Sequence, residues 1–199
     1  MTRTITRLYD NRNDALEAAH EIERMGVPTK DVSIIASNKD SWYNENDRGE
    51  LKDGKAHDKA HDTGGGIAKG AATGGVLGAG AGLLTGLGLL TIPGIGPVVA
   101  AGWLGATVIG AATGAAAGGA IGGLVGALTE AGVPEEDAHI YSEGVRRGGT
   151  LLSVRVDDSR ASELEAALDR YRPTDIRTRG QEYRSSGWTR FDPSTPPPP

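Results

Sequence analysis

The sequence of 199 residues contains no cysteine. This absence excludes a disulfide framework, a thiolate metal site and a cysteine nucleophile. Aromatic residues are also few, since the chain has three tryptophans, five tyrosines and one phenylalanine. Any apolar core is therefore expected to be small and mostly aliphatic. The formal net charge of -5 argues against a general nucleic-acid-binding protein, because such proteins are usually basic.

Charge is missing from one long stretch of the chain. Residues 70–129 contain no Asp, Glu, Lys, Arg or His, whereas the regions on both sides are rich in charge. Glycine is abundant instead, since 23 of the 31 glycines lie between Gly64 and Gly132. A collagen-like structure is excluded, because these glycines have no three-residue period. The uncharged stretch therefore predicts a distinct unit in the middle of the chain.

The glycines of this stretch recur at steps of four, which places them along one side of an α-helix. Small residues at that spacing let two helices pack closely, as they do in membrane proteins. The predicted helix-packing residues are Gly70, Gly74, Gly78, Gly82, Gly86, Gly102, Gly110, Gly114, Gly118, Gly122 and Gly126. Two prolines and two glycines between the two series predict a turn. The residues of this turn are Pro93, Gly94, Gly96 and Pro97.

We therefore expect a helical hairpin, with helices over 66–90 and 99–129. The first helix would be about 37 Å long, enough to cross the ~30 Å hydrocarbon layer of a membrane. Glycine costs about 1 kcal/mol per interior position of a helix in water, whereas in lipid the backbone has no other hydrogen-bond partner. These arguments favour insertion into the inner (cytoplasmic) membrane, with membrane lipid as a partner and both termini in the cytoplasm. The alternative is a soluble cytoplasmic protein that forms a homo-oligomer through the hairpin.

The charged regions on either side predict the two halves of one domain. Residues 1–37 have a β-α-β pattern, with strands at Thr4–Tyr9 and Asp31–Ala36 and a helix capped by Asn11 or Asn13. Residues 133–180 have an α-β-α-β pattern, with strands at Thr150–Val156 and Thr174–Thr178. Neither half has enough strands to cover its own apolar face. Together they match a ferredoxin-like split β-α-β sandwich, so the predicted fold class is α+β.

The remaining segments divide the chain further. Residues 38–63 are polar and predict a linker, and residues 64–132 hold the hairpin. Residues 181–199 end in four prolines and predict a disordered tail, in which Trp188 and Phe191 could dock onto a partner.

Three motifs resemble those of bacterial proteins with a general stress protein 17M-like (heat-induced stress protein) domain. They are Arg3-Thr-Ile-Thr-Arg-Leu-Tyr-Asp10 with Asp14-Ala15, Ile92-Pro-Gly-Ile-Gly-Pro-Val-Val-Ala-Ala-Gly-Trp103, and Glu136-Asp-Ala-His-Ile-Tyr-Ser-Glu-Gly-Val-Arg-Arg-Gly-Gly149. The resemblance covers about residues 3–180. It implies a stress-associated bacterial protein without an assigned catalytic activity, and it supplies no catalytic residues.

Few residues form a pattern that is typical of a chemical site. His57 and His61 are four residues apart and could bind a metal ion on a helix, but a solvated linker is the favoured interpretation. His139 and Glu143 could form an acid–base pair, and a surface ion pair is the ordinary alternative. We therefore predict no catalytic residue, metal or cofactor and identify no small-molecule ligand, so the protein is expected not to be an enzyme.

Overall fold

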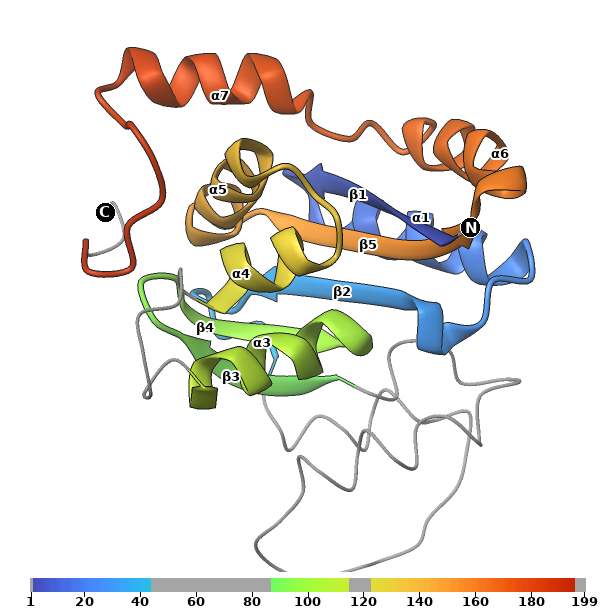
Figure 1. Cartoon of the computed structure of the whole chain (residues 1–199), viewed down its shortest axis with the longest axis horizontal. Helices are drawn as coiled ribbons and strands as arrows, with labels where there is room; N and C mark the ends of the chain where they lie inside the picture. Colours follow the sequence, from blue (N-terminus) through green and yellow to red (C-terminus); the bar gives the residue numbers. More distant parts are fainter. Residues whose placement is uncertain (1, 44–86, 115–122, 196–199) are drawn as a thin grey trace, which may run out of the picture.

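The computed structural model describes residues 2–43, 87–114 and 123–195. They form an α+β domain around one antiparallel five-stranded sheet, with the strand order β1-β5-β2-β4-β3 (Figure 1). The strands are β1 (Thr2–Tyr9), β2 (Val32–Ser37), β3 (Gly88–Ile92), β4 (Gly96–Ala101) and β5 (Thr150–Asp157). The helices are α1 (Arg12–Arg24), the short 3-10 helix η1 (Thr29–Asp31), α3 (Trp103–Gly114), α4 (Gly123–Glu130), α5 (Glu135–Arg146), α6 (Asp158–Asp169) and α7 (Ile176–Ser185).

The first β-α-β unit forms as the sequence predicts. The side chain of Asn11 accepts a hydrogen bond of 2.9 Å from the backbone N–H of Asn13, which caps α1. The apolar stripe of α1 is buried, with Ala18 and Ile22 at its centre. This stripe therefore fixes the face that α1 turns toward the sheet.

The two charged regions meet in the centre of the sheet. Strand β5 lies between β1 and β2 and is antiparallel to both, with Val154 opposite Ile5 on one side and opposite Val32 on the other. Residues 2–37 and 150–157 therefore share one sheet, although more than 100 residues separate them in the sequence.

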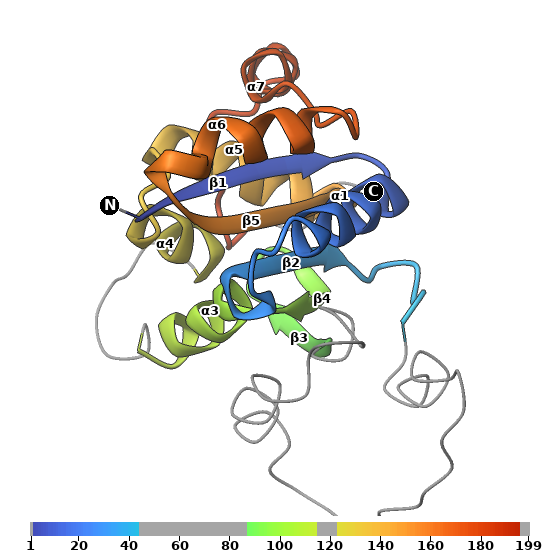
Figure 2. The ribbon, with the colours of Figure 1, turned by 90° about the vertical axis from the view of Figure 1, so that its right-hand side faces the viewer.

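Helices cover both faces of this sheet and enclose two cores (Figure 2). The first core lies under α1 and α6 and includes Ile22, Leu152 and Leu168. The second lies under α3, α4 and α5 and includes Leu104 and Leu128. Side chains on β5 alternate between the two faces, so this central strand supplies both cores.

The predicted helical hairpin is wrong around its turn. Residues 88–92 and 96–101 are strands β3 and β4, and they form a β-hairpin in place of the ends of two helices. A turn does lie between them, with Ile95 N–H donating to the carbonyl of Ile92 at 3.0 Å. Gly94 and Gly96 adopt φ values of 76° and 100°, which non-glycine residues rarely reach, and so they permit this tight connection.

The membrane-inserted hairpin is also contradicted. None of the helices in the described ranges is both long and apolar enough to cross a bilayer. Helix α3 has 12 residues, a length of about 18 Å against the ~30 Å of a hydrocarbon layer. The expected transmembrane helices and membrane location therefore have no support here, and the predicted helical residues 66–86 and 115–122 lie outside the described part of the chain.

The C-terminal region differs from its prediction in two ways. No strand forms over Thr174–Thr178, because Asp175 caps α7 by accepting a 2.7 Å hydrogen bond from Thr178 N–H. Residues 181–195 are ordered, since α7 continues to Ser185 and Phe191 is buried in the second core. The predicted disordered tail is therefore wrong over 181–195.

The start of the predicted linker is packed against the domain. Asn38 and Tyr43 are both buried, and Asn38 bonds to both the N–H and the carbonyl of Tyr43. The Tyr43 hydroxyl donates to the carbonyl of Leu87 at 3.3 Å. This bond brings together the residues on either side of segment 44–86, which is not among the described residues.

Candidate functional site

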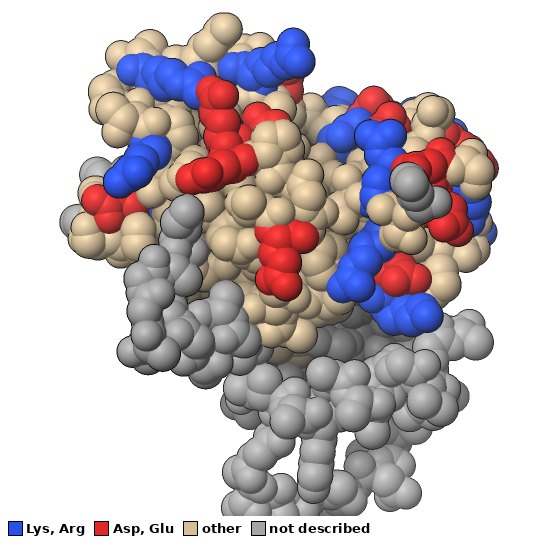
Figure 3. Space-filling model, viewed as in Figure 1, with Lys and Arg blue, Asp and Glu red and all other residues tan. Residues whose placement is uncertain are grey.

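One part of the domain carries no charge. Residues 87–114 and 123–129 contain no ionisable side chain, and we call them the uncharged part. They hold β3, β4, α3 and nearly all of α4. The ion pairs of the described chain all involve residues 3–24 and 135–184. In Figure 3 the Lys and Arg atoms lie toward α7 and on the α6 side, whereas the described surface around α4 carries only acidic atoms among uncharged ones. We call the other described residues, 2–43 and 130–195, the charged part.

A buried junction positions the uncharged part on β2. Ser33 donates its hydroxyl to the carbonyl of Ala101 at 2.7 Å and accepts the N–H of Leu104 at 3.2 Å. Gly102 lies between them with φ 83°, and a Cβ atom there would be 2.1 Å from the carbonyl oxygen of Val32. The chain can turn from β4 into α3 at this point because residue 102 has no side chain.

Several side chains of the uncharged part reach the surface. Thr91 on β3 and Ala106 on α3 are exposed, while Leu89, Leu90 and Trp103 are half-buried. Leu89 packs on the first core and Leu90 on the second. Leu90 and Trp103 therefore lie on the α3 face of the sheet and Leu89 on the other face, and none of these five residues is ionisable.

The predicted packing glycines have different positions in the structure. Gly110 and Gly114 lie in α3 and Gly126 lies in α4, two helices that contact each other. Gly102 lies between β4 and α3 and outside either helix. The remaining ones, Gly70, Gly74, Gly78, Gly82, Gly86, Gly118 and Gly122, lie outside the described residues.

The predicted turn residues lie at one end of the uncharged part. Pro93 and Gly94 belong to the β3–β4 turn, and Gly96 and Pro97 begin β4. A Cβ atom on Gly94 would be 2.3 Å from Pro193 Cα, so the C-terminal segment crosses the turn at this glycine. The turn is therefore in contact with the C-terminal segment of the described residues.

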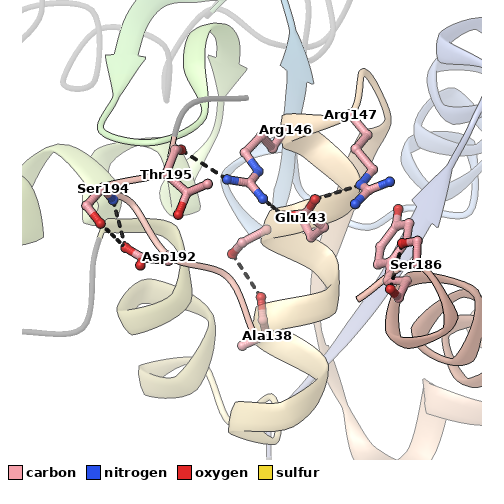
Figure 4. Close-up of polar contacts among 10 residues, drawn as sticks. Ala138, Glu143, Arg146, Arg147, Ser186, Asp192, Ser194 and Thr195 are labelled. Carbon is pink, nitrogen blue, oxygen red and sulfur yellow. Dashed lines mark hydrogen bonds and ion pairs between the residues drawn. The ribbon is translucent and has the colours of Figure 1, made fainter. Parts of the chain in front are cut away.

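A second cluster lies on α5, in the charged part. Glu143 is fully buried and pairs with two guanidinium groups, Arg146 Nη2 at 2.5 Å and Arg147 Nε at 2.6 Å (Figure 4). Arg146 also donates to the carbonyl of Thr195 at 3.1 Å. A carboxylate held by two cations and enclosed by protein is a structural ion pair and is poorly placed to exchange protons with a substrate.

Aromatic rings surround this cluster. The guanidinium carbon of Arg147 lies 4.4 Å from the ring centre of Tyr183, and that of Arg146 lies 5.4 Å from the ring centre of Phe191. Tyr183 makes an edge-to-face contact with Trp188 at 5.6 Å. Burial is the main cause that raises the pKa of Tyr183, so its hydroxyl stays neutral near pH 7.

The predicted pairing of His139 with Glu143 is not what the structure shows. His139 Nε2 lies 3.8 Å from Glu135 Oε1, one turn earlier on α5, while Glu143 pairs with the two arginines. No group of three His, Asp or Glu side chains that could hold a metal ion occurs within the described ranges. His57 and His61 lie outside those ranges.

A hollow of about 260 Å³ lies where β1 begins and η1 meets α6. Arg155 and Arg160 line it, but both guanidinium groups already have partners. That of Arg155 lies 3.8 Å from the ring centre of Trp103, and Arg160 donates to the carbonyl of Met25 at 2.8 Å. The hollow therefore offers no arginine ready for an anion.

Sequence reasoning missed the edge strand β3, because its leucines and glycines were assigned to a helix. A signal was present in the β-branched residues Thr91, Ile92, Val98 and Val99, which lie symmetrically about the turn. Comparison of the chain with family models, with curated proteins and with solved structures gives no significant match.

Proposed function

We propose that this protein is a non-enzymatic structural protein of the bacterial stress response that assembles with copies of itself through its uncharged part. The observation that carries this proposal is the separation of charge within one domain. Every ion pair of the described chain lies in the charged part, while β3, β4 and α3 contain no ionisable side chain. The stress association rests on the resemblance of three motifs to general stress protein 17M-like proteins.

Surface charge explains why the uncharged part suits self-association. The centres of protein interfaces are depleted of charged residues, because burying an unpaired charge is costly. Two identical copies that meet through charged surfaces must also place like charges near each other. Leu89, Leu90 and Ala106 avoid both costs, whereas the ring of Trp103 is already covered by the guanidinium group of Arg155.

The proposal has three further parts. The unit β1-α1-β2 with β5 and α6 is proposed to be a ferredoxin-like split β-α-β arrangement, in which the β3–β4 hairpin extends the sheet. The glycines of α3 and α4 are proposed to support close packing of these helices, which contact each other. We propose the cytoplasm as the site of action.

Sedimentation velocity of the purified full chain tests the proposal. Ala106 is exposed on α3 in the uncharged part, and Ala166 is exposed on α6 in the charged part. We expect the wild-type chain to form an oligomer and Ala106→Glu to raise its dissociation constant by about 100-fold or more, because a charge would be buried without a partner. The matched control Ala166→Glu should leave the oligomer unchanged.

Two results would contradict self-association through this surface. The first is a wild-type chain that remains monomeric at all concentrations measured. The second is an oligomer on which Ala106→Glu and Ala166→Glu have the same effect. Circular dichroism of both variants checks that each keeps the fold.

A further inference from the structure

The two edges of the sheet differ in how their backbone groups are used. At the β1 edge, the carbonyl of Leu8 accepts the N–H of Thr174 at 2.7 Å, and the carbonyl of Thr6 accepts the hydroxyl of Tyr141 at 3.0 Å. Arg3 and Arg7 on the same strand pair with carboxylates of α6. Partners and charges of this kind keep an edge strand from pairing with another chain.

The β3 edge has its outward groups on Leu89 and Thr91. Asn38 N–H donates to the carbonyl of Pro97, so this carbonyl points toward the β2 side of β4. Because backbone groups alternate in direction along a strand, those of Val98 point toward β3 and bond to Leu90, which lies opposite. The N–H and carbonyl groups of the next residues, Leu89 and Thr91, must then point away from β4.

These outward groups are available for a further strand. Across the described residues, no hydrogen bond beyond the β3–β4 ladder involves the backbone of Leu89 or Thr91. The strand has the sequence Gly-Leu-Leu-Thr-Ile, with no charge and no proline to block pairing. Within the part of the chain that the structure describes, the β3 edge therefore lacks the protection that the β1 edge has.

We infer that β3 pairs antiparallel with β3 of a second copy about a two-fold axis at Leu90. This inference rests on the proposed self-association and names its geometry. In this register Leu89 lies opposite Thr91 of the second copy, and each pair exchanges two N–H···O=C bonds. All four outward groups of each strand are then satisfied, which makes the strand complementary to itself.

The pairing has consequences for both faces of the sheet. The two five-stranded sheets become one sheet of ten strands. A two-fold axis perpendicular to that sheet leaves α3 and α4 of both copies on the same face. The two Leu90 side chains then meet on this face as a non-hydrogen-bonded pair.

Proline substitution tests the pairing with little cost to the monomer. Thr91→Pro removes an outward N–H from an exposed residue of β3, and this N–H has no role in the β3–β4 ladder. We expect the dissociation constant of the full chain to rise about ten- to hundredfold, since two bonds across the axis are lost. Thr4→Pro is the matched control, because its N–H also points outward, on the β1 edge, and it should have no effect.

Cysteine cross-linking tests the register itself. The chain has no cysteine, so one introduced residue reports on one position. In the inferred register the two copies of residue 90 have Cα atoms about 4.5 Å apart, within disulfide range. Leu90→Cys should give a disulfide-linked dimer on oxidation with diamide, whereas Thr91→Cys should not, because the two copies of residue 91 are offset along the strands.

The outcomes separate this inference from the proposed function. A monomeric wild-type chain overturns both. An oligomer that Ala106→Glu dissociates but Thr91→Pro does not, or in which Leu90→Cys and Thr91→Cys cross-link equally, overturns the β3 pairing and leaves self-association standing. Dissociation by Thr91→Pro together with selective cross-linking at residue 90 supports it.

Discussion

The charged and uncharged parts of this domain share one sheet but are held in place by different means. In the charged part, capped helices and ion pairs fix the structure, and Glu143 with its two arginines is the most buried example. In the uncharged part, main chains approach closely where a side chain is missing, as at Gly102. The difference shows that polar partners and small residues can each position a helix on the same sheet.

The largest expected effect is on the charged part. Glu143→Ala would leave Arg146 and Arg147 without their shared carboxylate, and Arg146 is almost fully buried. We expect the free energy of unfolding to fall by about 4 kcal/mol, because a buried charge loses its partner. Urea denaturation at pH 7 measures this change.

Glu182→Ala is the matched control for that prediction. Its carboxylate is largely exposed and lies 3.2 Å from Arg179 on the same helix. Exposed pairs contribute little, so the expected loss is below about 1 kcal/mol. Equal losses for the two variants would mean that burial of the Glu143 cluster does not stabilise the charged part.

The next effect is on the uncharged part. A Cβ atom in Gly102→Ala would be 2.1 Å from the carbonyl oxygen of Val32 and 2.8 Å from Ser33 Cα, and the residue has φ 83°. We expect a loss of about 3 kcal/mol, from the unfavourable φ and from overpacking against backbone atoms. Thermal and urea unfolding both report it.

Gly26→Ala separates the two causes. Gly26 also has φ 83°, but a Cβ atom there would have no neighbour within 4 Å. Its expected loss is therefore only about 1 kcal/mol, the cost of the backbone conformation. If both alanines cost the same, close approach at Gly102 adds nothing, and the contrast between the two parts disappears.

The smallest effect depends on pH. Burial is the main cause that raises the pKa of Tyr141 to about 12, and its hydroxyl donates to Thr6. In the unfolded chain this tyrosine ionises near pH 10, so its contribution to stability is complete below pH 10 and is lost as the pH rises toward 12. By pH 11 the loss from this residue is about 1.4 kcal/mol.

Tyr141→Phe isolates that contribution. The variant should be about 1 kcal/mol less stable at pH 8, where the hydrogen bond is lost, but its stability should fall less steeply above pH 10. Urea unfolding at several pH values from 8 to 11 gives both slopes. Parallel slopes would show that Tyr141 has the same pKa in the folded and unfolded states. The uncharged part has no ionisable side chain, so it cannot contribute to the pH dependence.

The first β-α-β unit and β5 could be predicted from the sequence because their signals are local. Asn11 was one of two candidate caps for α1, and the run of leucine and valine in Thr150–Val156 marks β5. The strand predicted at Thr174–Thr178 is wrong because Asp175 caps a helix there by bonding to Thr178. Asp175 is a residue type that often caps helices, but its bond to the N–H of Thr178 could be identified only in the structure.

The uncharged part was harder to predict because its residues are compatible with both helix and strand. A four-residue glycine period favours a helix, yet β4 pairs with β2 over Ile34–Ser37, and this tertiary contact decides the conformation of Val98 and Val99. Burial of Glu143 could not be predicted either. Arg146 ends the same helix and Arg147 is its C-cap residue, but Phe191 and Thr195, which contact Arg146, come from a segment expected to be disordered.

The hydrogen bond between Tyr43 and Leu87 joins two strands that do not pair with each other. Asn38 holds Tyr43 just beyond the end of β2, and Leu87 directly precedes the edge strand β3. Because β4 lies between β2 and β3 in the sheet, the Tyr43 hydroxyl ties the start of the edge strand to the end of a central strand. The position of the β3 edge therefore depends on a side chain that belongs to neither β3 nor β4.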